Sequence, residues 1–111
     1  MDKLNKIYAE WQKLNDELFQ ESKGYIKECL SKTIDNSVSL DECNIYVTYD
    51  GGRHPEYDAT PFSHVERVYL KNGNIYVDTE DCYQYDIDNI TASDLFDIAY
   101  SVGYIIENEY E

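Results

Sequence analysis

Carboxylates are the most abundant chemically functional side chains in this sequence, and their negative charge is its most informative property. The chain has 111 residues, of which 23 are acidic and 9 are basic, so its formal net charge is −14. The charges of residues 1–33 cancel, whereas residues 34–71 sum to −4 and residues 72–111 to −10. A surface with this charge could bind a basic protein, and it would repel nucleic acid and anionic membranes. We therefore expect a basic protein partner and no direct contact with nucleic acid or membrane.

Metal binding and catalysis have weaker support. Asp86-Ile87-Asp88-Asn89 begins like a calcium loop, but Ile90-Thr91 stands where that loop needs an oxygen ligand followed by Gly. Neither His54 nor His64 lies at zinc-ligand spacing to a cysteine. Gly51-Gly52 lacks the Gly and Lys that complete a phosphate-binding loop. The sequence therefore predicts no metal, no cofactor and no enzymatic activity.

The cysteines favour a reducing compartment. Cys29, Cys43 and Cys82 are an odd number at unpatterned spacings, which is typical of free thiols rather than of a disulfide framework. Nothing local joins any of them to a histidine as a nucleophilic pair. The chain also has no apolar segment near the ~20 residues of a membrane span, and no signal-peptide pattern. We expect a cytoplasmic protein.

The first third of the chain is predicted to be helical. Apolar side chains recur at three-four spacing, which indicates a helix face that packs on a core. Gly24 interrupts this region at a cost of roughly 1 kcal/mol relative to Ala. The region is therefore either one helix over about residues 3–33 or two helices bent near Gly24, and we favour two. The periodic positions are Leu4, Ile7, Tyr8, Trp11, Leu14, Leu18, Ser22, Tyr25, Ile26, Cys29, Leu30 and Thr33.

A strand and a long connection are expected next. Residues 44–49 alternate and are rich in β-branched and aromatic residues, which predicts a strand. Residues 50–63 contain both prolines and little periodicity, which predicts a loop. This loop could be an ordered binding loop or a mobile connection.

Asn72-Gly73 is the strongest local signal in the chain. It lies between two alternating segments, and a type I′ hairpin turn needs positive φ at both central residues. The aliphatic residues of this hairpin then share one face, and the tyrosines and charged residues share the other. The predicted pairs are Leu70 with Ile75, Tyr69 with Tyr76, Val68 with Val77, and Arg67 with Asp78.

A second hairpin is predicted to extend the sheet through residues 83–88. A three-residue loop, Glu80-Asp81-Cys82, aligns Val77 with Tyr85 and Ile75 with Ile87, whereas a two-residue loop would mix the apolar and acidic faces. The residues expected together on the solvent face are Tyr76, Asp78, Gln84, Asp86 and Asp88. The candidate partner-binding residues are Tyr69, Tyr76, Asp78, Glu80, Asp81, Tyr83, Asp86 and Asp88.

The chain is expected to close with a helix over residues 91–108. Thr91 followed by Asp94 fits a capping box in which Asp replaces the usual Glu. The sequence thus predicts one α+β domain over residues 1–111. Helices in residues 1–34 and 91–108 would pack on one face of a three- to four-stranded antiparallel sheet within residues 43–88.

In its size, its acidity and its strands rich in Tyr, Asp and Glu, the chain resembles small DNA-mimic inhibitors of phages and mobile elements, the anti-restriction and anti-CRISPR proteins. The resemblance is one of composition over residues 34–111. It implies a non-enzymatic inhibitor that blocks the nucleic-acid-binding cleft of a bacterial defence nuclease in the host cytoplasm. Asp78, Glu80, Asp86 and Asp88 would then stand in for phosphates.

Other functions fit the same pattern. An immunity or antitoxin protein could neutralise a basic toxin by the same electrostatics. A housekeeping interaction module could bind its partner through residues 53–63 or through the helical face. In that case the acidity would serve solubility alone.

Overall fold

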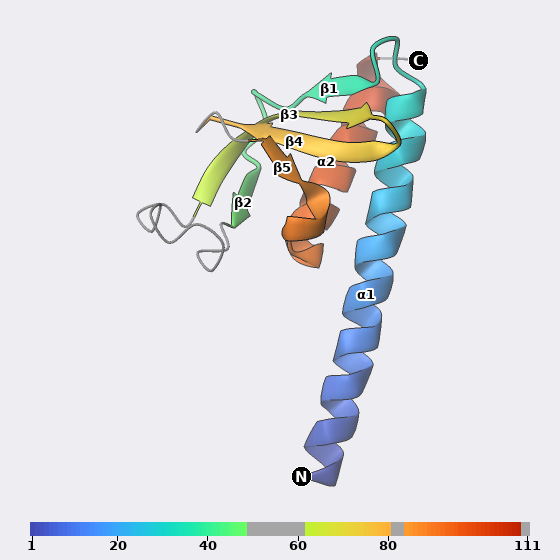
Figure 1. Ribbon diagram of the computed structural model, residues 1–111, viewed down its shortest axis with the longest axis vertical. Helices are drawn as coiled ribbons and strands as arrows, with labels where there is room; N and C mark the ends of the chain where they lie inside the picture. The colour runs from blue at the N-terminus through green and yellow to red at the C-terminus, as the bar shows by residue number, and fades with distance from the viewer. Residues whose placement is uncertain (49–61, 81–83, 110–111) are drawn as a thin grey trace.

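The computed structural model describes residues 1–48, 62–80 and 84–109 and has an α+β fold (Figure 1). Two helices, α1 (Asp2–Ser31) and α2 (Ala92–Glu109), pack against one face of an antiparallel sheet. The fold class predicted from the sequence is therefore confirmed. The strands are β1 (Ser37–Ser39), β2 (Tyr46–Thr48), β3 (Phe62–Lys71), β4 (Asn74–Thr79) and β5 (Gln84–Asp86), and the short 3-10 helix η2 (Ile87–Asn89) leads into α2.

The described strands follow the order β1-β3-β4-β5, and β2 also pairs with β3. β1 pairs with Arg67–Tyr69 and β2 with Phe62–His64, so the two short strands share one edge of β3. The sheet is therefore four strands wide. β1 was not predicted, because its three residues contain a single apolar side chain, Val38.

The predicted hairpin is confirmed in register and in turn type. Asn72 and Gly73 have φ of 54° and 80°, as a type I′ turn requires. All four predicted pairs across β3 and β4 are present, and Val77 pairs with Tyr85 across β4 and β5. The prediction that the strand continues to Ile87 is wrong, because β5 ends at Asp86 and Ile87 begins η2.

A β-bulge in β3 was also not predicted. The register shifts between Val65 and Arg67, so that Glu66 is an extra residue opposite β4. Val65 and Val68 are both fully buried although they are three positions apart, and strict alternation would place them on opposite faces. The Glu66 carbonyl accepts a hydrogen bond from the Leu40 N–H at 2.8 Å. The bulge therefore lets one strand bury both valines and pair with β1 and β2 in turn.

Helix α1 is continuous through Gly24, so the preferred prediction of two helices is wrong. Gly24 lies on the exposed side of the helix. Its low helix propensity is offset by the packing of Ile26 and Leu30, which are both fully buried. The N-terminal half of α1 projects beyond the sheet (Figure 1). The molecule accordingly measures 51 × 35 × 26 Å along its principal axes.

Some predicted features lie outside the described residues. The loop predicted over residues 50–63 does so up to residue 61, and its last two residues already belong to β3. Cys82 and His54 are also outside. Among the helices that the structure describes, none has the length and apolar character needed to cross a membrane.

Candidate functional site

The outer face of the sheet holds four of its side chains in a connected ladder. The Tyr69 and Tyr76 rings stack across β3 and β4, with centroids 5.7 Å apart and an interplanar angle of 28°. The Arg67 guanidinium lies over the Tyr69 ring at 4.4 Å from its centroid, and it donates to Asp78 Oδ2 at 3.1 Å. These contacts follow from the hairpin register, which sets Arg67 opposite Asp78 and Tyr69 opposite Tyr76. The ladder is an aromatic platform with a paired charge at one end.

The ladder changes the expected character of this face. Tyr69, Tyr76 and Asp78 lie together as predicted, but Arg67 neutralises much of the Asp78 charge at the surface. Stacked aromatic rings beside a paired Arg form a contact surface suited to protein interfaces, where Tyr and Arg are enriched.

The surroundings of Tyr69 in the ladder raise the pKa of its phenol. Burial raises the pKa of Tyr69 above its ordinary value, the Asp78 carboxylate raises it further, and Arg67 lowers it. We expect Asp78→Asn to lower the pKa of Tyr69 toward its ordinary value, because a neutral amide no longer opposes the phenolate. Nuclear magnetic resonance of ring-labelled tyrosine, assigned with Tyr69→Phe, measures this shift. An unchanged pKa in Asp78→Asn would contradict it.

The same shift predicts how stability depends on pH. A raised pKa in the folded state means that the folded protein holds the Tyr69 proton more tightly than the unfolded chain. The protonated Tyr69 therefore contributes its full stabilisation of the folded state at neutral pH. That contribution is lost as pH rises from ~10, the ordinary tyrosine pKa, through the higher pKa of the folded state. The stability of Tyr69→Phe should therefore decline less steeply at alkaline pH than that of the unsubstituted protein.

The remaining predicted site residues lie in different places. Glu80 follows β4; its N–H donates to the His64 carbonyl at 3.0 Å, and its Oε1 accepts from the His64 N–H at 3.4 Å. Asp86 pairs in register with Tyr76. Asp81 and Tyr83 are outside the described residues.

Asp88 does not project from the outer face of the sheet, so that prediction is wrong. The residue lies in η2, and its carboxylate is 3.6 Å from Lys23 Nζ of α1. Helix α1 packs on the opposite face of the sheet, through Ile26 and Leu30. The strand ends because η2 turns the chain at this point toward α2, and Asp88 follows that turn.

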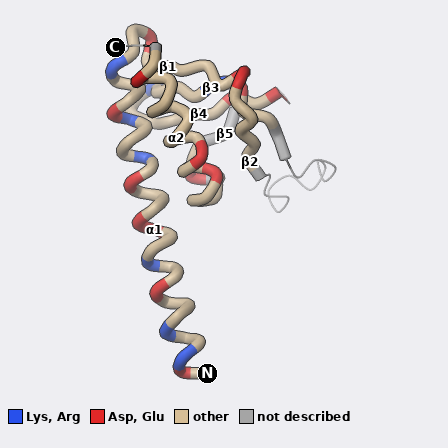
Figure 2. The backbone as a smooth tube through the Cα atoms, turned by 180° about the vertical axis from the view of Figure 1, so that it is seen from behind, with Lys and Arg blue, Asp and Glu red and all other residues tan. Residues whose placement is uncertain are grey.

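Acidic residues gather instead over several elements beyond α1, and we call residues 34–111 the acidic body. Its described residues include twelve acidic and two basic side chains. Figure 2 shows acidic positions in η2 and at the adjoining start of α2, whereas α1 alternates basic and acidic positions along its length. Thr91 Oγ1 accepts from the Asp94 N–H at 3.2 Å and so caps α2, as the Thr91–Asp94 spacing predicted.

Metal and thiol chemistry gain no support from the described residues. No group of three His, Cys, Asp or Glu among them could hold a metal ion. His64 Nε2 is 2.8 Å from the Cys43 carbonyl oxygen, and its ring packs against Tyr46. Burial raises the pKa of the Cys29 thiol, which disfavours the reactive thiolate.

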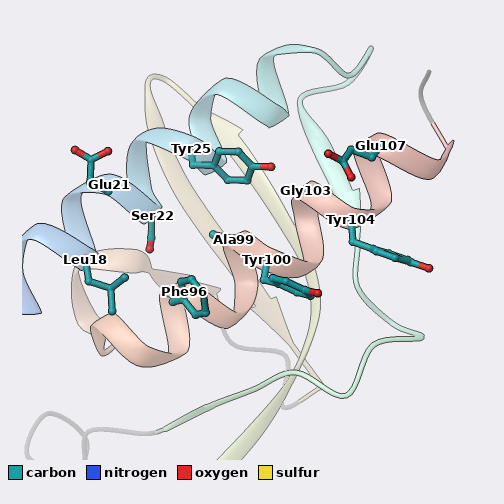
Figure 3. A pocket seen from close by; sticks show the side chains of 10 residues that line it. All are labelled: Leu18, Glu21, Ser22, Tyr25, Phe96, Ala99, Tyr100, Gly103, Tyr104 and Glu107. Carbon is teal, nitrogen blue, oxygen red and sulfur yellow. The ribbon is translucent and has the colours of Figure 1, made fainter.

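A groove between α1 and α2 was missed by sequence reasoning (Figure 3). Its volume is about 510 Å³, and it is open to solvent. Gly103 allows the helices to approach, because a Cβ there would lie 2.9 Å from Tyr25 Cε2. The signal was present in the sequence, since Phe96, Tyr100 and Tyr104 lie beside the apolar stripe of α2. The lining residues are Leu18, Glu21, Ser22, Tyr25, Phe96, Ala99, Tyr100, Gly103, Tyr104 and Glu107.

Comparison of the chain with protein-family models, with curated proteins and with solved structures finds no match. Its function is therefore proposed from its own charge and geometry.

Proposed function

We propose that the protein is a non-enzymatic inhibitor whose acidic body occupies the nucleic-acid-binding cleft of a basic protein. The partner class is a bacterial defence nuclease in the cytoplasm, and the inhibitor is of the anti-CRISPR or anti-restriction kind that phages and mobile elements encode. One observation supports this most directly: the negative charge belongs to the acidic body, whereas the charges of the preceding residues 1–33 cancel. The chain sums to −14, and residues 1–33 contribute zero.

The charge density of the body approaches that of DNA. Duplex DNA has one charge per ~1.7 Å of axis, so fourteen charges correspond to about 24 Å of duplex. The two shorter extents of the molecule, 35 and 26 Å, are of the same order. Negative charges at this density repel one another and so destabilise the compact folded state. A need for solubility alone is therefore a weak explanation for the high charge.

The Tyr69–Tyr76 ladder adds a means of contact that charge alone does not supply. Both rings are half-buried and are held by stacking and by Arg67, so binding them costs little side-chain entropy. A partner cleft that binds nucleic acid offers cations and flat apolar surfaces, which match carboxylates and aromatic rings respectively.

Inhibition assays test the proposal. DNA cleavage by a panel of RNA-guided and restriction nucleases is measured with the protein at low and at high salt. We expect inhibition of at least one enzyme, relieved by competing DNA and by salt, because association between opposite charges is screened. Capture of the partner from the native host under both salt conditions also distinguishes a nuclease from a basic toxin.

A matched pair of variants locates the surface. Reversal of Asp78, Glu80 and Asp86 to Lys should weaken inhibition by roughly 100-fold, since it replaces attraction with repulsion at the contact. Reversal of Asp2, Asp16 and Glu28 to Lys on α1 changes the net charge equally and should weaken it only about 3-fold, through screened long-range forces. Thermal unfolding confirms that both variants fold. Equal inhibition by the two variants would exclude this surface.

A further inference from the structure

Helix α1 exposes an apolar stripe that the described structure leaves largely uncovered. Six side chains of its first five turns leave 38 to 61% of their surface exposed: Leu4, Ile7, Tyr8, Trp11, Leu14 and Leu18. Helices of fewer than about 12–15 residues are marginal in water without packing, and an amphipathic helix gains its stability from its covered face. The projecting half of α1 therefore has the sequence of a packed helix and, by itself, no packing partner.

We propose that residues 2–18 of α1 pair with the same segment of a second copy, forming an antiparallel two-helix dimer. This dimer does not depend on the acidic surface proposed above. It would join two molecules through a segment whose charges nearly cancel.

The spacing of the stripe suits such a pair. Leu4, Trp11 and Leu18 stand seven residues apart, and Ile7 and Leu14 fall between them, as in the a and d positions of a heptad repeat. In an antiparallel pair centred near residue 9, Leu4 faces the partner's Leu14, and Ile7 faces the partner's Trp11. Tyr8 and Trp11 stack with centroids 5.9 Å apart, so the central aromatic pair is already arranged within one copy.

Charge complementarity selects this orientation. The positions that flank the seam on one side are Lys3, Glu10 and Glu17. Antiparallel pairing places Lys3 beside the partner's Glu17 twice, and Glu10 beside the partner's Glu10 once. Parallel pairing places Lys3 beside the partner's Tyr8 and forms no ion pair along the seam.

The acidic bodies also favour the antiparallel arrangement. Phe19 is the first apolar side chain of α1 that is half-buried against the body. With the pair centred near residue 9, the two Phe19 positions lie twenty residues apart along the axis, or about 30 Å at ~1.5 Å per residue. This exceeds the ~8–10 Å Debye length at physiological salt, whereas a parallel pair would place the two bodies side by side.

The buried area is sufficient for a specific contact. The five side chains that face the partner in this register, Leu4, Ile7, Tyr8, Trp11 and Leu14, offer roughly 600 Å² per copy, or about 1,200 Å² in total, which is near the lower limit for a stable interface. We therefore expect a dimer of micromolar rather than nanomolar affinity.

Sedimentation equilibrium from low micromolar to submillimolar concentration tests the dimer. The unsubstituted protein should form dimers, and Trp11→Glu should weaken association by more than about 100-fold, as expected for a central aromatic anchor. The substitution lies outside the packed body, so circular dichroism and thermal unfolding should show that Trp11→Glu still folds. A protein that stays monomeric throughout, or a dimer that Trp11→Glu leaves intact, would overturn the proposal and assign the stripe to a different occupant.

A charge exchange tests the orientation. Lys3→Glu and Glu17→Lys should each weaken the dimer about 3- to 10-fold, because each creates two like-charge pairs. The double variant should restore it by exchanging the partners, and Glu10→Gln should strengthen it. The control, Lys13→Glu with Asp16→Lys, faces away from the seam and should have no effect. Failure of the double variant to restore association would exclude this register.

Discussion

Val77→Asp is expected to unfold the protein at neutral pH. Val77 is fully buried in β4, between β3 and β5, and it packs in the same core as Leu95 of α2. A carboxylate at this position would lose its hydration, and no basic side chain lies among the buried residues that the structure describes. The cost of an unpaired buried charge exceeds about 4 kcal/mol and approaches the whole stability of a small domain.

The neighbouring position provides the control. Asp78 has the opposite orientation on the same strand, and its carboxylate pairs with Arg67 at a partly exposed site. Asp78→Val should cost less than about 1 kcal/mol, because exposed ion pairs contribute little and Val suits a strand. Urea unfolding followed by circular dichroism measures both variants. Similar losses in the two would mean that the assignment of faces in this hairpin is wrong.

Acid should partly rescue Val77→Asp. Burial raises the pKa of the introduced carboxyl in the folded state, so the folded protein binds a proton that the unfolded chain releases. Stability should therefore increase as pH falls toward the ordinary carboxyl pKa near ~4. The unsubstituted protein sets the pH at which acid itself unfolds this fold. If Val77→Asp stays unfolded at every pH above that limit, this mechanism is wrong.

The hairpin could be predicted from sequence because its determinants are local. Asn72-Gly73 fixes the turn, and alternation on either side fixes which face is buried, so the pairs from Arg67–Asp78 to Leu70–Ile75 followed directly. The bulge at Glu66 could not be predicted, because alternation continued back from Val68 places Val65 on the wrong face. The reason for the extra residue is visible only in the structure, where β1 and β2 pair with different parts of β3 on either side of the bulge.

The candidate site was predicted in part for a similar reason. Tyr69, Tyr76 and Asp78 share a face because of local register, and the structure adds the Arg67 contact that balances the charge. Asp88 was misplaced because the end of β5 depends on how η2 packs. That packing is tertiary, and no residue of the segment signals it.

The apolar stripe of α1 shows a different limit of sequence patterns. Three-four periodicity identifies a face that is apolar, but it does not identify what covers that face. The pattern runs through Leu14 and Leu30 alike, although Leu14 is 56% exposed and Leu30 is fully buried. The same periodic pattern therefore covers two different surfaces of α1, one that packs in the core and one that is exposed outside it.

The same substitution at these two positions should separate the surfaces. Leu30→Ala removes buried methyl groups from the core formed with Ile26 and Val68, and it should lower the free energy of unfolding by about 3–5 kcal/mol. Leu14→Ala should change it by less than about 0.5 kcal/mol in the monomer, since Ala favours a helix and little packing is lost there. Urea unfolding at low micromolar protein measures both. At submillimolar protein, Leu14→Ala should become destabilising relative to the unsubstituted chain, because only the dimer covers that position and mass action links association to folding. A Leu14→Ala effect that is large and independent of concentration would place residue 14 against the molecule's own body.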